Sequence, residues 1–438
     1  MTAGRAEAML RDWLADGGTE AIAPRRAGDP PVVGTTRVLD VADLGRGVRL
    51  VLFEADGVVS AAPVVTGPDG PSRAAAGDGA FEAIAGLVRE GRPAGGVWPR
   101  VFRAVPSASG ERAIDVDQSN RSVVVGERLV VKLFPRPGHG PQPGEDLPAH
   151  LAAVGFGDVP ELYGSVRWTV GDDRWLIATV TAFLPGARDG WTWFLELARR
   201  AIAADDPGPA SDAAERCGEL VARFHVALAT PSAVLDGAPL ERAGVPQVEA
   251  WRTRAHALLD DALVVTPGEH GARLAALAPR VRDAIAAFGD VDATPTQRIH
   301  GDLHVGQILR WDGGDAVADL DGNPLAPAPE RLARQPAARD VASFVRSLDH
   351  LARIVQARDG AHPEAADRWS RAVRRRFLDA YRTALDDAGA RDLYDERLVR
   401  PFEVAQACHE YVYAARFLPR WATVADLALP ALLAELDA

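Results

Sequence analysis

The hydrophobic pattern of this chain changes its period partway along, and that change limits the folds available to it. Up to about residue 184, short apolar runs alternate with turns rich in glycine and proline, as in β-strands. Past Pro185 the apolar residues recur every three or four positions, as in Leu220, Phe224 and Leu228, which is typical of amphipathic helices. For 438 residues, this order predicts two lobes, one strand-rich and one mostly helical.

Two regions are expected within the strand-rich part. In the first, strands at 36–41, 48–54 and 58–65 precede an amphipathic helix over 79–90, and the Gly/Pro-rich segment 91–99 is predicted to be an exit linker. The second contains a hairpin of 122–125 and 128–134, followed by a strand over 175–184. Later helices are expected behind a Ser211 cap and at 272–289, 338–357, 366–387 and 401–416. The predicted domains are therefore an α+β cap (1–95), a strand-rich lobe (96–184) and a helical lobe (185–438).

Composition excludes several classes of function. Acidic residues outnumber basic ones by 61 to 49, and the net charge of −12 argues against a nucleic-acid partner. Two cysteines cannot make a disulfide framework, so we expect a reducing compartment. The first residues carry charges where a signal peptide is apolar, and no long apolar run follows. We therefore expect a cytoplasmic protein with no membrane contact. A monomer or weak dimer is a separate expectation, which these patterns do not determine.

The segment from His300 to His304 carries the clearest chemical signal. Gln307 follows Asp302 by five residues, and Asp319 follows Gln307 by twelve, after a short strand at 316–318. Phosphoryl transfer from a nucleotide requires a carboxylate near the attacking hydroxyl and oxygen ligands for Mg²⁺. A hairpin that returns Asp319 to the Asp302 loop would meet both needs. One alternative is a polar turn whose Asp and His cap a helix.

These motifs, HGDLHVGQILR and VADLDG, resemble those of the aminoglycoside-phosphotransferase-like branch of the protein-kinase-like fold. DQSNRSVVVGERLVVKLF, FLPGARDGWTW, PAARDVASFVRSLDH and HEYVYAARFLPRW extend the resemblance to the actinobacterial maltokinase-like and glucosamine kinase family, over most of residues 100–425. The resemblance implies an α+β, bilobal kinase fold with an N-terminal cap. It also implies ATP as co-substrate and Mg²⁺ as cofactor.

The resemblance assigns roles to individual residues. Asp302 matches the catalytic aspartate, and Gln307 and Asp319 match the Mg²⁺ ligands. Lys132, the chain's only lysine, matches the lysine that binds the nucleotide phosphates; an unpaired ammonium in its apolar strand would be costly. Glu145 and Asp146 both remain candidates to orient that lysine, with the familial register favouring Asp146. The remaining nucleotide contacts are expected from the turn residues Ser119, Asn120 and Ser122 and from the hinge residues Val180 and Ala182.

The acceptor side departs from the maltokinase pattern. Maltokinases usually follow the metal aspartate with Phe-Glu-Gly-Glu-Pro, whereas this chain has Leu-Asp-Gly-Asn-Pro, and a His-Glu pair stands at 409–410. Both features resemble the glucosamine kinases, and carboxylates favour an ammonium through charge-assisted hydrogen bonds. The expected function is phosphorylation of glucosamine at its 6-hydroxyl. The expected acceptor contacts are Asp302, His304, Asp321, Asn323, His409, Glu410 and Trp421, with Trp191 and Trp193 as further stacking candidates.

Three other functions stay open at this point. A maltokinase, which makes maltose 1-phosphate, is the principal alternative. An aminoglycoside phosphotransferase would suit the acidic composition, because its substrates are polycations. A nucleotide-binding regulator without catalysis is disfavoured by the presence of Asp302, Gln307, Asp319 and Lys132.

Overall fold

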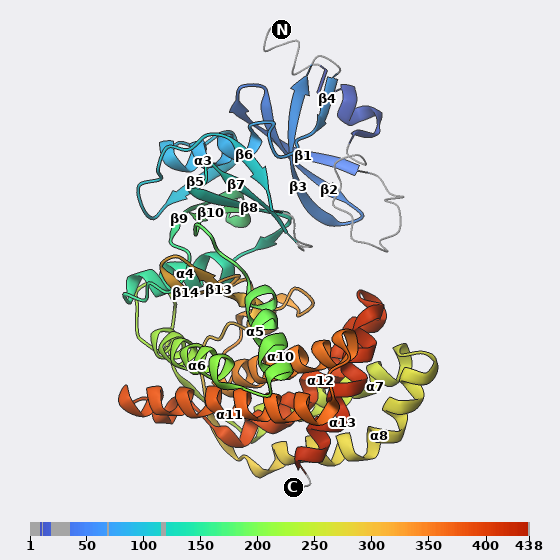
Figure 1. Ribbon diagram of the computed structural model, residues 1–438. Coiled ribbons are helices and arrows are strands. Elements are labelled where there is room, and N and C mark those ends of the chain that lie inside the picture. The colour runs from blue at the N-terminus through green and yellow to red at the C-terminus, as the bar shows by residue number, and fades with distance from the viewer. Residues whose placement is uncertain (1–8, 11, 19–35, 68–69, 115–119, 437–438) are drawn as a thin grey trace. The chain divides into compact units, whose positions relative to one another are not determined.

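The computed structural model describes residues 9–10, 12–18, 36–67, 70–114 and 120–436. They divide into two compact units (Figure 1). The first comprises residues 1–152 and 160–185, and the second comprises 153–159 and 186–438. The break at residue 185 lies where the hydrophobic period changes. Within the described residues, no helix combines the length and the apolar run that crossing a bilayer would require.

The first unit contains two antiparallel sheets. The four-stranded sheet has the order β1 (Thr36–Gly45), β2 (Val48–Ala55), β3 (Val58–Gly67) and β4 (Gly70–Arg73), and α3 (Ala80–Glu90) follows it. The six-stranded sheet has the order β5 (Val97–Val101), β9 (Leu162–Val170), β10 (Asp173–Ala182), β8 (Leu129–His139), β7 (Arg121–Val125) and β6 (Glu111–Ala113), and α4 covers Pro143–Ala153. The expected strands, the helix over 79–90 and the hairpin are confirmed.

One hydrophobic core joins the two sheets. Leu50 and Leu52 of β2, Phe81 of α3, and Val123 and Val131 of the six-stranded sheet belong to the same buried cluster. Residues 36–90 therefore pack as part of the first unit, and an independent cap of residues 1–95 stays a proposal.

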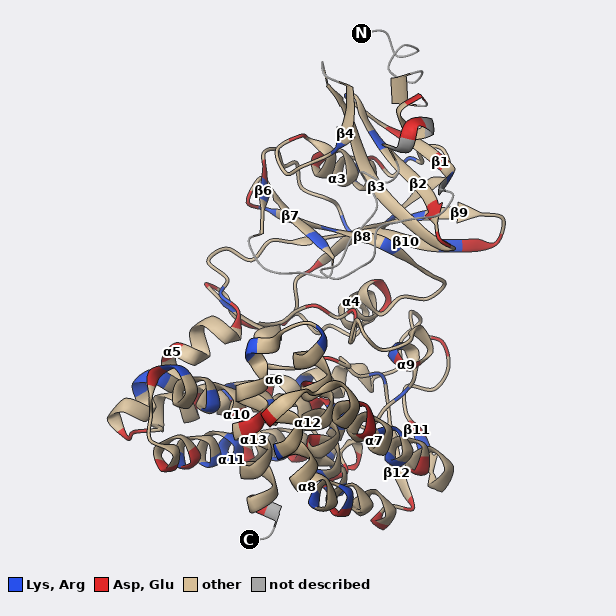
Figure 2. Ribbon diagram, turned by 90° about the vertical axis from the view of Figure 1, so that its right-hand side faces the viewer, with Lys and Arg blue, Asp and Glu red and all other residues tan. Residues whose placement is uncertain are grey.

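The second unit is mostly helical. Its helices are α5 (Gly190–Ala204), α6 (Gly208–Leu228), α7 (Val245–Val265), α8 (Gly268–Ala286), α9 (Ala328–Leu332), α10 (Ala337–Asp359), α11 (Pro363–Asp387), α12 (Val399–Arg416) and α13 (Ala422–Leu436). Two antiparallel strand pairs accompany them, β11 (Glu241–Gly244) with β12 (Ala293–Thr296) and the hairpin of β13 (Ile308–Trp311) with β14 (Gly314–Val317). Figure 2 shows basic and acidic residues interspersed along these helices.

Several local expectations are wrong or incomplete. Part of the expected linker 91–99 is strand β5, which pairs with β9. Ser211 does not cap α6, because the helix begins earlier and the Ser211 N–H already donates to the Pro207 carbonyl. The sequence patterns give no prediction for α5, α7, α13 and β9. Helix α13 is apolar nearly all round, so it lacks a clear helical pattern. Strand β9 contains Gly164, where a Cβ would lie only 2.5 Å from the Arg100 carbonyl oxygen.

The side chain of Glu111 of β6 caps the N-terminus of α3. Its carboxylate accepts the backbone N–H groups of Gly77 (2.8 Å), Gly79 (3.2 Å), Phe81 (2.7 Å) and Glu82 (2.9 Å). These include donors that have no partner within the helix itself. The contact also ties the six-stranded sheet to the loop that follows the four-stranded one.

We expect Glu111→Ala to destabilise the first unit by about 1–3 kcal/mol, because it leaves several backbone donors without a partner. Urea unfolding followed by tryptophan fluorescence measures this loss. Glu127→Ala, which removes an exposed ion pair with Arg112 at the neighbouring turn, is the control and should change stability little. Equal effects of the two substitutions would contradict the capping role.

Candidate active site

The backbone of Ala318 is hydrogen-bonded to the two segments that carry Asp302 and Gln307, and it directly precedes Asp319. The Asp302 N–H donates to Nδ1 of His300 (3.3 Å), so Nε2 of that ring carries the proton and donates to the Ala318 carbonyl (2.9 Å). The Ala318 N–H in turn donates to the Gln307 carbonyl (2.8 Å). Since Asp319 follows directly, these bonds bring Asp302, Gln307 and Asp319 to one place.

The hairpin expected before Asp319 is present. β13 and β14 pair from Ile308 with Val317 to Trp311 with Gly314, which returns the chain to the Asp302 loop. Asp319 then adopts a φ of 60°, a left-handed conformation that few residues other than glycine, asparagine and aspartate tolerate. The chain therefore turns sharply where the proposed metal ligand stands.

Asp340, in the first turn of α10, holds the same loop from the other side. Its carboxylate accepts the N–H groups of His300 (2.7 Å) and Gly301 (2.9 Å) and lies 3.3 Å from Nε2 of His225. Burial alone would raise the pKa of Asp340, but His225, His300 and the Gly301 N–H outweigh it and hold the pKa below its usual range. Asp340 is therefore a charged anchor for the loop.

Asp302 lies in a setting that suits a base. Burial raises its pKa to about 6. Nδ2 of Asn323 lies 3.3 Å from Oδ1 of Asp302 and donates to it. Asn323, expected to touch the acceptor, thus also contacts the carboxylate that would take the proton. A cavity lined by Gly301, Gly322 and Asn323 opens beside it.

His304 is the centre of a second group. Its Nδ1 accepts the Gly306 N–H (3.1 Å), and its Nε2 lies 3.4 Å from the amide nitrogen of Gln307. His304 therefore caps a short turn, as the alternative interpretation of the motif expected. The same turn also contains Gln307, a candidate metal ligand. Burial lowers the pKa of His304 to about 4, so the ring is neutral at physiological pH.

Aromatic rings continue from His304 towards the C-terminal helices. The ring centroid of Trp191 lies 5.7 Å from that of His304 and 5.8 Å from that of Trp421. The ring centroids of Trp421 and His350 lie 5.3 Å apart. Trp191 and Trp421 thus stay candidates for stacking on a sugar. Trp193 does not, because it is 4% exposed, donates to the Ile308 carbonyl and packs under a guanidinium.

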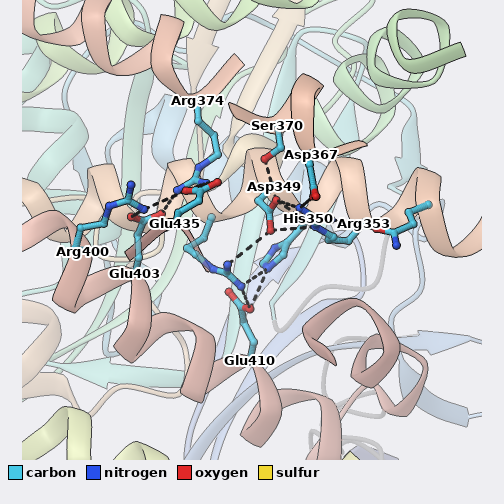
Figure 3. Close-up of polar contacts among 12 residues, drawn as sticks. Asp349, His350, Arg353, Asp367, Ser370, Arg374, Arg400, Glu403, Glu410 and Glu435 are labelled. Carbon is cyan, nitrogen blue, oxygen red and sulfur yellow. Dashed lines mark hydrogen bonds and ion pairs between the residues drawn. The ribbon is translucent and has the colours of Figure 1, made fainter. Parts of the chain in front are cut away.

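Glu410 is neither solvated surface nor an isolated carboxylate. It is 5% exposed, and its Oε2 accepts from Nη2 of Arg346 (2.9 Å) and lies 2.9 Å from Nε2 of His350. Burial would raise the pKa of Glu410, but Arg346 and His350 outweigh it and hold the pKa at about 2. Figure 3 shows Glu410 pointing from α12 towards His350 of α10.

Two further expected contacts are less defined. His409 is half-buried, and burial lowers its pKa. Asp321 is half-buried in the turn after Asp319 and has a polar or ionic partner within the structure. The acceptor roles of both stay predictions.

In the first unit, Lys132 occupies the middle of the six-stranded sheet. It lies opposite Ser122 of β7 and Thr179 of β10, so these three residues share the face of the sheet opposite the buried Val131. Asn120 precedes β7 and has a partner within the structure, and Ser119 lies outside the described residues. The phosphate-binding roles of these residues stay predictions.

The structure separates the two acidic residues of α4. Glu145 is fully buried and bonded to Arg100 (3.0 Å) and to Nε of Arg167 (2.6 Å). Asp146 accepts the Gln142 N–H (2.8 Å), and burial together with Glu145 raises its pKa. Because two arginines already engage Glu145, Asp146 remains the candidate for Lys132.

The hinge residues offer fewer groups to adenine than expected. The Val180 side chain is fully buried in the core, and the Ala182 N–H already donates to the Glu161 carbonyl (2.8 Å). The next N–H, that of Phe183, donates to the Arg128 carbonyl (2.9 Å). Adenine recognition by this strand therefore cannot use these two N–H groups as they stand.

The donor set fits Mg²⁺ held jointly with phosphates. Among the described residues, no three His, Cys, Asp or Glu side chains gather to enclose a metal by themselves. Gln307 and Asp319 nevertheless bring an amide and a carboxylate oxygen to segments joined at Ala318. Mg²⁺ commonly takes one or two protein oxygens and completes its shell with water and phosphate.

Sequence reasoning missed Asp340, Arg346 and His350. A signal for them exists, because Arg346, Asp349, His350 and Arg353 recur at helical spacing within the predicted helix 338–357. A charged stripe of this kind is usually a solvated face, whereas here all four residues are buried.

Three comparisons with known proteins all match this chain to phosphotransferases. A model of the phosphotransferase enzyme family matches residues 111–322. The chain is 41% identical to a glucosamine kinase of Streptacidiphilus jiangxiensis, with 94% of each chain covered, and 37% identical to one of Mycolicibacterium smegmatis, with 91% of this chain and 98% of that one covered. A solved glucosamine kinase in complex with glucosamine, ADP and inorganic phosphate matches with a TM-score of 0.75 at 38% identity, covering 94% of this chain and 98% of that one. The expected kinase-like fold is confirmed.

We expect Asp340→Asn to lower kcat by about 10-fold or more, because an amide cannot accept both loop N–H groups as a carboxylate does. Steady-state kinetics with the acceptor proposed below tests this. Asp359→Asn, at the exposed end of the same helix, is the control. A normal kcat in Asp340→Asn would show that the loop does not depend on this carboxylate.

The depressed pKa of Glu410 predicts how stability responds to acid. Its contribution is complete above its ordinary pKa, near 4.5, and is lost as the pH falls towards about 2. Unfolding free energies measured between pH 7 and pH 3 should therefore decline below pH 4.5. The decline should be shallower in Glu410→Gln, and an unchanged slope would contradict the assignment.

Proposed function

Because the chain belongs to the family of the glucosamine kinases that it matches over more than nine-tenths of its length, we propose that it transfers the γ-phosphate of ATP to the 6-hydroxyl of D-glucosamine. The observation that carries the proposal is the joining of Asp302, Gln307 and Asp319 through Ala318. ATP as the donor also supports the cytoplasmic location expected from the sequence.

Asp302 acts as the base. The proton of the acceptor hydroxyl passes to its carboxylate as the hydroxyl oxygen bonds to the γ-phosphorus, and the bond from that phosphorus to the bridging oxygen of ADP breaks. A raised pKa near 6 supports this role, since it leaves the carboxylate ionised at neutral pH yet able to take a proton. Asn323 fixes the carboxylate through Oδ1.

Nucleotide binding is assigned to two sets of residues, one that holds the metal ion and one that binds the phosphates. Gln307 and Asp319 hold Mg²⁺, which supplies charge neutralisation at the phosphates. Lys132, oriented by Asp146, binds the phosphates together with Ser119, Asn120 and Ser122. The ammonium of Lys132 suits phosphate as a compact charge, and it would be costly in this apolar strand without such partners.

The acceptor is held by side chains of the second unit. Glu410 and Asp321 bind the amine, and His304, Asn323 and His409 bind ring hydroxyls. Trp421 packs against the ring. The aromatic series from His304 to His350 supports this arrangement, because it places Trp421 beside a residue that contacts Glu410.

We expect Asp302→Asn to reduce kcat by about 10²–10⁴-fold while the KM for ATP changes little, because only the proton acceptor is lost. A coupled ADP-release assay measures both constants. Asp312→Asn, exposed on the β13–β14 turn, is the matched control. Turnover near that of the wild type in Asp302→Asn would overturn the mechanism.

Acceptor identity is tested with a panel of glucosamine, glucose, maltose and kanamycin, each supplied with ATP and Mg²⁺. The highest kcat/KM is expected for glucosamine, with phosphate on O6 by NMR of the product. A preference for maltose would favour a maltokinase, and one for kanamycin an aminoglycoside phosphotransferase. Equal use of glucose and glucosamine would remove the argument from the amine.

A further inference from the structure

The two carboxylate oxygens of Glu410 lie in different environments. Oε2 is bonded by Arg346 and lies within hydrogen-bond distance of His350. Oε1 is buried and has no hydrogen-bond partner in the described part of the chain. Leaving a buried carboxylate oxygen without a donor costs free energy, so a donor from outside the chain is the natural complement of Oε1.

We propose that Arg346 and His350 are positioning residues for acceptor recognition: they fix Oε2 of Glu410 so that Oε1 is presented to an N–H or O–H donor of the acceptor. The proposal rests on the proposed function. It deepens that function by naming the residues of helix α10 that orient Glu410 of α12 for selective binding of the acceptor. Neither residue needs to touch the acceptor.

Arg346 is itself held in place. It is about 1% exposed, and its Nη1 lies 3.7 Å from Asp349 one turn along α10. Asp349 is in turn bonded by Arg353 (2.9 Å) and by Ser370 of α11 (2.8 Å). Figure 3 shows Asp349, Arg353 and Ser370 converging between the helices. A guanidinium restrained in this way keeps its partner carboxylate in one rotamer.

His350 adds a second restraint from the same helix. Its Nε2 lies 2.9 Å from Oε2 of Glu410, and its ring stands edge-on to Trp421 at 5.3 Å and 83°. Through His350, the carboxylate and the indole proposed to contact the acceptor are therefore held relative to each other. Truncation of His350 would loosen both.

The test compares Arg346→Gln and His350→Gln with Arg353→Gln. Arg353 belongs to the same helix and the same buried network but bonds Asp349 and Asp367 rather than Glu410. For Arg346→Gln and His350→Gln, we expect the KM for glucosamine to rise about 10-fold or more while kcat and the KM for ATP stay within about twofold. In Arg353→Gln thermal stability should fall, and the KM for glucosamine should rise much less than in the other two variants, because Arg353 reaches Glu410 only indirectly, through Asp349 and Arg346.

A double variant separates positioning from stability. If Arg346 acts through Glu410, adding Arg346→Gln to Glu410→Gln should raise the KM for glucosamine no further. Additive effects, an unchanged KM in folded Arg346→Gln and His350→Gln, or an equal rise in Arg353→Gln would overturn the inference. Should Arg346→Gln not fold, His350→Gln decides by itself. Failure of the wild type to phosphorylate glucosamine would instead overturn the proposed function.

Discussion

The carboxylate of Asp340 is the contact on which the rest of the site depends. It accepts two consecutive backbone N–H groups of the Asp302 loop from the first turn of α10, with His225 behind it. His300, held in this way, reaches Ala318 and so places Asp319. Because the anchor is a buried charge with complete partners, the loop has one favourable arrangement rather than several.

The same helix also contacts Glu410, one of the proposed acceptor residues. Further along α10, Arg346 and His350 contact Glu410, and Asp349 contacts α11. Burying these charges has a desolvation cost that their attraction roughly offsets, so the network is a weak argument for stability. Its effect is also geometric, since each guanidinium is bonded to more than one residue: Arg346 to Glu410 and Asp349, and Arg353 to Asp349 and Asp367.

In the first unit, too, buried or capping carboxylates fix the positions of neighbouring elements, although fewer charged residues take part. Lys132 lies on a central strand whose other face is core, and Glu145 and Glu111 each bind groups distant in sequence. These contacts tie α4 and α3 to the six-stranded sheet. The elements next to the predicted phosphate turn are thus held by ion pairs and caps as well as by packing.

The sequence by itself determined the change from strands to helices near residue 185, several individual elements and the motif of Asp302, Gln307 and Asp319, because hydrophobic period and short motif spacing are local properties. It also indicated Lys132, since a solitary lysine in an apolar strand requires a partner. Tertiary structure alone decided that Glu145 pairs with arginines, that Trp193 is core and that Glu410 is clamped by α10. Those outcomes depend on which helices face one another, and charges with the same spacing are equally compatible with a solvated surface until their neighbours in space are known.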